Sequence, residues 1–198
     1  MVCFLLTRVG SFTKEMPMRT IYVGVVILLT VWAAGSTPGH AQSNTLTLFG
    51  SGSGAFETPP LSTGGVATAT CTLNRTSVEI SCTARVHNIV DLTAAHIHVG
   101  GPGVAGPVLM DIPNIPLRGS DDFTLSWTWT QSNLRLRPAH GILKMADVFE
   151  ACSSGNCYLN FHTSQNPGGE IRLNLCPQGH EGRAANTFFS INVCSPSR

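Results

Sequence analysis

The chain carries little charge, and the charge that it has is scattered. Charged residues make up 12% of the 198 residues, the formal net charge is +1, and Lys and Arg together number 12. Electrostatic capture of nucleic acid needs a concentrated basic face, so the sequence predicts no nucleic-acid partner. The hydrophobic fraction of 42% is sufficient for one folded domain with terminal segments.

Patterns that mark well-known catalytic or metal sites are also missing. The sequence has no Cys-x-x-Cys pair, which argues against a cysteine-rich zinc site. It has no Gly-x-Ser-x-Gly nucleophile elbow, and cysteines held in disulfides would supply no thiol nucleophile. Catalysis is therefore the less favoured class of function, and we assign no catalytic residue.

The first 41 residues are predicted to be a start region and an export signal. An almost unbroken apolar run at 21–34 follows Lys14 and Arg19 and precedes small residues. This order is typical of a secretory signal peptide, with cleavage after Gly35 or Ala41. The run is short for a membrane span. We therefore expect a secreted or periplasmic protein that meets the membrane only through this signal.

The cysteines beyond the leader are even in number, which indicates disulfides in an exported chain. Six cysteines allow 15 pairings, and their spacing favours the sequential one. Those pairs are Cys71–Cys82, Cys152–Cys157 and Cys176–Cys194. The third pair would tie the tail at 177–198 to the domain at 42–176.

Short stretches rich in Val, Thr, Ile and aromatic residues, separated by turns, dominate the domain. We expect an edge strand within 43–57, a helix at 142–151, and strands near 66–73, 77–89, 95–99, 108–112, 123–130, 158–163 and 170–175. Trp127 and Trp129 share the apolar face of their strand and are expected in the core. The pattern predicts an all-β antiparallel sandwich.

Two histidines, two residues apart, mark the candidate site. In an extended strand His96 and His98 share one face, while Ala95, Ile97 and Val99 share the other. The same alternation places the polar residues of the last two strands on non-core faces. Pairing of these strands would bring six polar side chains together: His96, His98, Asn160, His162, Glu170 and Arg172.

These residues resemble the signature of the CHRD domain, first recognised in chordin and widespread in bacterial secreted proteins. The similarity lies in Ala-His-Ile-His at 95–98 with its Gly-Pro-rich loop, in 158–163, in 166–172, and in Glu-Thr-Pro-Pro at 57–60. It spans about 46–175, and the cysteines and the tail are additions to the family pattern. The resemblance implies an immunoglobulin-like, superoxide-dismutase-like β-sandwich or barrel, and it implies no established activity.

Two hypotheses for the cluster remain open. In the first, the imidazoles donate to Glu170, which Arg172 clamps, so the cluster ties strands together. The protein would then be a non-catalytic binding or structural module, with an extracellular protein or a surface component as its partner.

In the second hypothesis, His96, His98 and His162 bind copper or zinc, with Glu170 as a further ligand or an orienting group. A carboxylate or sugar ligand is a third alternative. Three further histidines beyond the predicted leader are expected in loops or at the surface: His87, His140 and His180. The placement of Arg172 discriminates between the first two hypotheses, since a cation beside the imidazoles opposes metal binding.

Overall fold

The computed structural model describes residues 43–116 and 122–178, which belong to one compact unit. The strands within this part of the chain are β1 (Thr45–Ser53), β2 (Val66–Asn74), β3 (Glu79–His87), β4 (Leu92–Val99), β5 (Val108–Asp111), β6 (Phe123–Trp129), β7 (Cys157–Thr163), β8 (Ile171–Asn174) and β9 (Cys176–Pro177). The helices are α1 (Met145–Ser153) and the short 3-10 turns η1 (Gly54–Phe56), η2 (Gln131–Asn133) and η3 (Pro138–His140).

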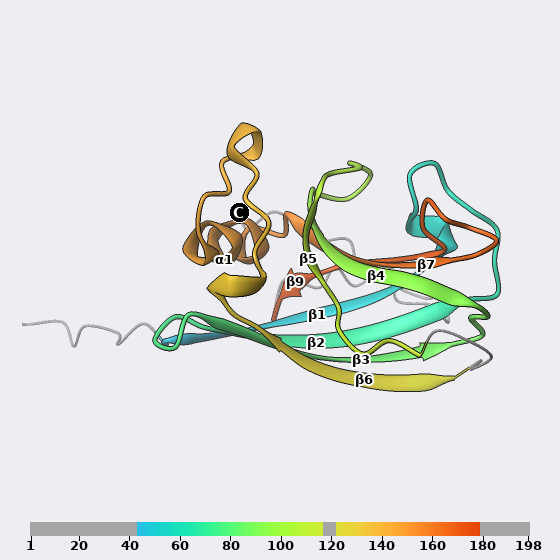
Figure 1. Cartoon of the computed structure of the whole chain (residues 1–198), viewed down its shortest axis with the longest axis horizontal. Coiled ribbons are helices and arrows are strands. Elements are labelled where there is room, and N and C mark those ends of the chain that lie inside the picture. The colour runs from blue at the N-terminus through green and yellow to red at the C-terminus, as the bar shows by residue number, and fades with distance from the viewer. Residues whose placement is uncertain (1–42, 117–121, 179–198) are drawn as a thin grey trace, which may run out of the picture. The chain divides into compact units, whose positions relative to one another are not determined.

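The strands form one antiparallel sheet that bends into two layers. Its order is β5-β4-β7-β8-β1-β2-β3-β6, and β9 pairs with β1. Figure 1 shows β4 and β7 above β1, β2, β3 and β6. The Trp129 indole on β6 donates to the Asp111 carbonyl on β5 at 2.6 Å, so the two ends of the strand order meet. The prediction of an all-β fold with one short helix is confirmed.

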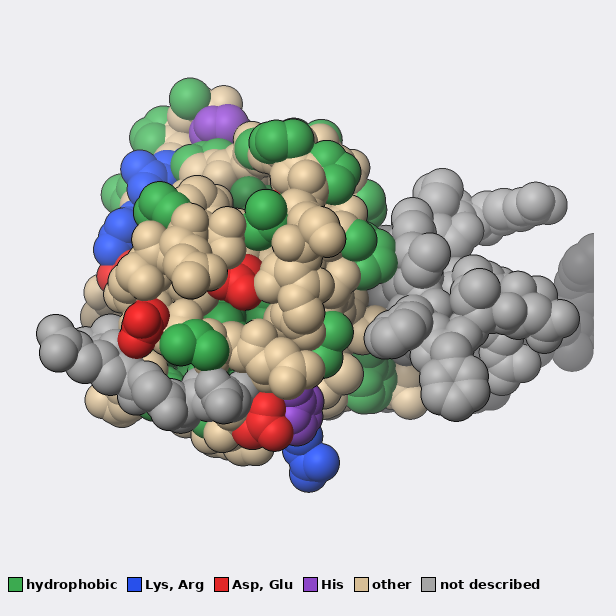
Figure 2. All heavy atoms as spheres, turned by 90° about the vertical axis from the view of Figure 1, so that its right-hand side faces the viewer, with side chains coloured by type: hydrophobic (Ala, Val, Ile, Leu, Met, Phe, Trp, Pro, Cys, Tyr) green, Lys and Arg blue, Asp and Glu red, His purple; other side chains and the backbone are tan. Residues whose placement is uncertain are grey.

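The alternation of residues in β2 and β3 explains the core of the lower layer. Every second residue in these strands is buried, and the intervening Thr, Ser and Arg side chains point outward. Cys71 and Cys82 are direct partners in this register and form a disulfide. Charged side chains are sparse on the face in Figure 2, as the composition predicts.

Two details differ from the sequence prediction. The strand expected at the sheet edge is β1, which lies inside the sheet because both β2 and β8 pair with it. The helix begins at Met145 rather than 142, since Ile142 pairs with Arg137 in an isolated bridge. The Asp147 carboxylate accepts from the backbone of residue 144 at 3.0 Å and so fixes the helix start. Trp127 and Trp129 are buried, as expected.

The predicted cysteine pairing is confirmed where both partners are described. Cys71–Cys82 and Cys152–Cys157 are disulfides. Cys176 is also disulfide-bonded, but Cys194 lies outside the described residues, as does the segment interpreted as an export signal. Among the described residues, none of the helices has the length and apolar character needed to cross a membrane.

The outer face of the β4–β7–β8 layer is the feature that positions the site. All residues of β7 and β8 are buried, including the polar ones that alternation places away from the core. Two loops, 54–65 and 100–107, cover this face, because Arg172 on β8 donates to Thr58 in the first loop and to Gly101 in the second. The sheet therefore has a second buried layer, which is polar.

We predict that Gly52 is required for the pairing of β1 with β8. A Cβ atom at this position would lie 1.9 Å from the Arg172 carbonyl oxygen, so the strands would have to separate. We expect Gly52→Ala to lower the free energy of unfolding by about 3 kcal/mol in urea denaturation. Gly64→Ala is the control, because a Cβ there meets nothing within 4 Å. Equal stability of the two variants would contradict the register.

Candidate metal centre

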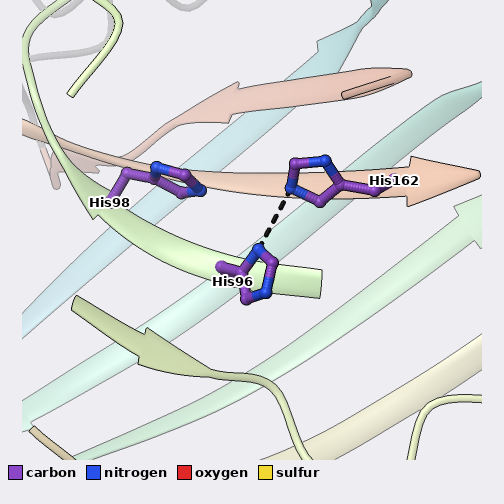
Figure 3. A group of neighbouring side chains, drawn as sticks. All are labelled: His96, His98 and His162. Atoms are coloured by element: carbon purple, nitrogen blue, oxygen red, sulfur yellow. Dashed lines mark hydrogen bonds between the residues drawn. The ribbon is translucent and has the colours of Figure 1, made fainter. Parts of the chain in front are cut away.

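Three histidines from two adjacent strands converge on the outer face. His96 and His98 lie on β4, and His162 lies on β7, where it pairs with Ala94. One ring nitrogen from each histidine lies within 4.8 Å of the others. Figure 3 shows the three rings turned toward one another. The sequence predicted this grouping from the alternation of β4 and β7 and their pairing.

The His98 ring is held in one orientation with one nitrogen left unpaired. Its Nδ1 donates to the Gly106 carbonyl at 2.9 Å, so Nε2 carries a lone pair, and that buried atom has no partner in the described part of the chain. The ring stacks on Tyr158 with centroids 4.7 Å apart. Burial lowers the pKa of His98 to about 4, so the imidazole is neutral at physiological pH.

The His162 ring is held in the same way. Its Nδ1 donates to the Pro167 carbonyl at 3.0 Å, which leaves Nε2 as a lone-pair nitrogen. That nitrogen faces His96 Nδ1 at 3.1 Å (Figure 3). Burial lowers the pKa of His162. Two of the three histidines thus present a free lone pair to the cluster.

His96 has an oxygen on one side and a nitrogen lone pair on the other. Its Nε2 lies 3.4 Å from Asp111 Oδ1, and Arg135 donates to the other oxygen of the same carboxylate. If the ring proton is on Nε2, the Nδ1 lone pair faces the lone pair of His162. If the proton is on Nδ1, the Nε2 lone pair faces a carboxylate. A neutral ring cannot satisfy both neighbours.

A second proton on His96 would satisfy both neighbours, but the surroundings disfavour it. Burial lowers the pKa of His96, and the neighbouring His162 lowers it further, while Asp111 acts in the opposite direction. A metal ion satisfies the same geometry without that proton. Each ring would donate its other N–H to an oxygen, which is the usual arrangement of metal-bound histidines. The residues present therefore fit a metal ion.

Glu170 lies beside the cluster but is occupied elsewhere. It precedes β8 and accepts hydrogen bonds from Thr63 and Thr163, both at 2.6 Å, and from Asn166 at 3.0 Å. Burial raises the pKa of Glu170, but these hydrogen bonds together hold it below the ordinary value. Glu170 thus ties the 54–65 loop to β7 rather than orienting a histidine.

Arg172 turns away from the histidines. The guanidinium donates to the Gly101 carbonyl at 2.7 Å and the Val104 carbonyl at 3.1 Å, and lies 3.6 Å from the centre of the Tyr158 ring. Because β4 and β8 flank β7 on opposite sides, the Tyr158 ring lies between this charge and His98. The Glu170–Arg172 clamp of the first hypothesis is not among the ion pairs of the described residues, and the objection to a cation is reduced.

Sequence reasoning missed Glu57, Asp111 and Arg135 as parts of the site. Asp111 occupies an outward position on β5, opposite His96, so strand alternation could have found it. Glu57 comes from a loop 103 residues before Asn160, and no periodicity connects the two. His87 and His140 are exposed, as expected, and His180 lies outside the described residues.

Glu57 is a buried carboxyl with an incomplete set of hydrogen bonds. Asn160 Nδ2 donates to its Oε2 at 3.3 Å, whereas Oε1 is buried without a partner among the described residues. Burial raises the pKa of Glu57 from 4.5 to about 7, although the Asn160 hydrogen bond and the Arg172 charge oppose this shift. Glu57 thus keeps its proton in mildly acidic solution.

We predict that Glu57 makes the fold less stable as the pH rises. Its pKa is higher in the folded chain, so the unfolded chain releases the proton first, and stability falls between pH 4.5 and about 7. Glu57→Gln removes this loss. At pH 8 we expect the variant to be more stable than wild type by on the order of 1–3 kcal/mol, and at pH 4 nearly equal. Urea denaturation at several pH values between 4 and 8 measures the free energy of unfolding of both proteins.

Glu79→Gln, on β3 outside the site, is the matched control for Glu57→Gln. It should not change the slope of stability against pH. A Glu57→Gln variant with the wild-type slope would contradict the raised pKa.

Comparison with known families identifies the domain that contains this site. The family model of the CHRD domain matches residues 49–174. No curated protein and no solved structure gives a significant match. The matched segment contains the three histidines, the two covering loops and Arg172. By this match over more than half of its length, the chain belongs to the CHRD domain family.

Proposed function

We propose that this CHRD domain is an exported metal-binding protein that holds a copper or zinc ion through His96, His98 and His162. The single observation that carries the proposal is the arrangement of ring nitrogens. The outer nitrogen of each ring faces an oxygen from Gly106, Pro167 or Asp111. The inner nitrogens of His98 and His162 are left with lone pairs, and His96 Nδ1 lies 3.1 Å from the lone pair of His162.

The strand-tying hypothesis explains part of the outer face and leaves the histidines unexplained. Glu170 and Arg172 do tie the loops to the sheet, through neutral partners rather than through each other. A network of hydrogen bonds among the imidazoles would need a donor at each contact. His98 Nε2 has no partner in the described residues. If His96 Nδ1 donates to His162 Nε2, the His96 Nε2 lone pair faces the Asp111 carboxylate at 3.4 Å.

The donor set suits copper and zinc. Neutral imidazole is a good ligand for both metals, and three histidines without a carboxylate leave a coordination position open. Export is consistent with the disulfides, since these form and persist in oxidising compartments. The open position is compatible with holding the ion or with presenting it to another molecule, and we propose the binding role.

We predict that the mature domain, purified without a metal-affinity step, contains one copper or zinc ion per chain. We expect His98→Ala to weaken binding of that metal about 100-fold in competition titrations with a chelator. His140→Ala is the matched control, since His140 is exposed in η3, away from the cluster. Circular dichroism verifies that each variant is folded. A wild-type protein that binds neither metal at micromolar concentration would overturn the proposal.

We also predict that Asp111 supports the site through His96. The carboxylate favours the proton on His96 Nε2 and so frees Nδ1 for the metal. Asp111→Asn should weaken metal binding about 10-fold, with a smaller effect on thermal stability. Asp91→Asn is the control, because Asp91 has a left-handed backbone (φ 54) that asparagine adopts readily. Equal affinities of the two variants would exclude a role for the carboxylate.

A further inference from the structure

Unsatisfied polar atoms are concentrated around the histidines. Within the described residues, four buried side-chain atoms lack a hydrogen-bond partner, and three of these belong to Glu57, His98 and Asn160. An unpaired buried polar atom is costly and rare in native proteins. Asn160 is only 4% exposed, and its unpaired atom is the amide oxygen Oδ1.

Asn160 occupies the middle of the face that carries the triad. It pairs directly with His96 on β4, and the next pair on the same face is His98 with Tyr158. His162 follows Asn160 by two residues on the same strand face. Asn160 therefore lies on the same strand face as the triad, between Tyr158 and His162 on β7 and opposite His96 on β4.

The surroundings of the Asn160 amide show which of its atoms lacks a hydrogen-bond partner. Nδ2 donates to Glu57 Oε2, so the oxygen is the free atom. The backbone at Gly169 closes over the amide, because a Cβ there would lie 2.5 Å from Oδ1 and 2.7 Å from Nδ2. Glu57 and Gly169 thus hold the amide in place without satisfying its oxygen.

We infer that the amide oxygen of Asn160 takes part in the metal site by accepting a hydrogen bond from the ion's water ligand, and that Glu57 orients the amide. This inference rests on the proposed function. Three histidines leave a coordination position open, and a water molecule completes such a shell. Asn160 Oδ1 accepts a hydrogen bond from that water, and the Glu57 carboxyl holds the amide nitrogen away from the ion. The recognised ligand is therefore a hydrated copper or zinc ion.

The decisive variant exchanges the acid and the amide. In Asn160→Asp combined with Glu57→Gln, the amide of residue 57 donates to the carboxylate of residue 160, so the hydrogen bond between the two positions is kept. A negative charge then stands beside the triad, on the same strand face. We expect Zn²⁺ to bind about 10-fold more tightly than to wild type, measured by calorimetry at pH 7.

Asn174→Asp is the matched control for the added charge. Asn174 lies on β8, on the same sheet face, and accepts from Arg172 Nε at 3.2 Å, so a carboxylate there is paired with a cation. We expect its Zn²⁺ affinity to stay within about 2-fold of wild type. Asn160→Leu, which keeps the size and removes the oxygen, should weaken binding about 5-fold, and it keeps the inference testable if the exchange variant does not fold.

The outcomes separate this inference from the proposed function. If wild type binds Zn²⁺ but Asn160→Leu and the exchange variant bind no differently from Asn174→Asp, Asn160 faces away from the ion and the inference is overturned, while the histidine site stands. If wild type and His98→Ala bind Zn²⁺ equally weakly, the proposed function fails, and the inference fails with it. If the exchange variant binds Zn²⁺ more tightly than wild type and Asn174→Asp does not, the result supports both the proposed function and this inference.

Discussion

The His96 imidazole stands between the carboxylate of Asp111 and the imidazole of His162, and a neutral ring has one proton to share between them. The distances of 3.4 Å and 3.1 Å keep both neighbours close enough for the conflict to matter. His162 cannot supply a proton of its own at this contact, because its Nδ1–H is directed to the Pro167 carbonyl. A cation bound by the inner ring nitrogens would remove the need for a second proton on His96.

The buried outer face holds the three histidine rings in fixed orientations. A metal site on an exposed strand face would have mobile ligands, whereas here each ring is fixed by a backbone or carboxylate oxygen. Those oxygens come largely from loops, and Arg172 holds the Gly-Pro loop in place through the Gly101 and Val104 carbonyls. Arg172 is 1% exposed, and its charge is bound to these loop carbonyls rather than directed at the histidines.

Strand alternation was enough to predict the histidine triad, the buried tryptophans and the two disulfides with described partners, because each depends on a local two-residue period or a close cysteine spacing. The same reasoning did not predict the partners of Glu170, because this residue lies in the turn before β8, where strand alternation no longer determines the direction of a side chain. Strand alternation could not predict the role of Glu57 at all. Its partner is 103 residues away, and only the folded chain shows that the loop after η1 returns to the face of β7.

The protonation states of the three imidazoles provide the most direct test of the metal site, and nitrogen-15 NMR of the histidine rings measures them. In the metal-free protein at pH 8, we expect the N–H proton on Nδ1 of His98 and His162 and on Nε2 of His96. Addition of Zn²⁺ should shift His98 Nε2, His162 Nε2 and His96 Nδ1 toward the values of metal-bound nitrogen. A stable proton on His96 Nδ1, with no shift on addition of metal, would rule out a metal site here and leave a hydrogen bond that ties the two strands together.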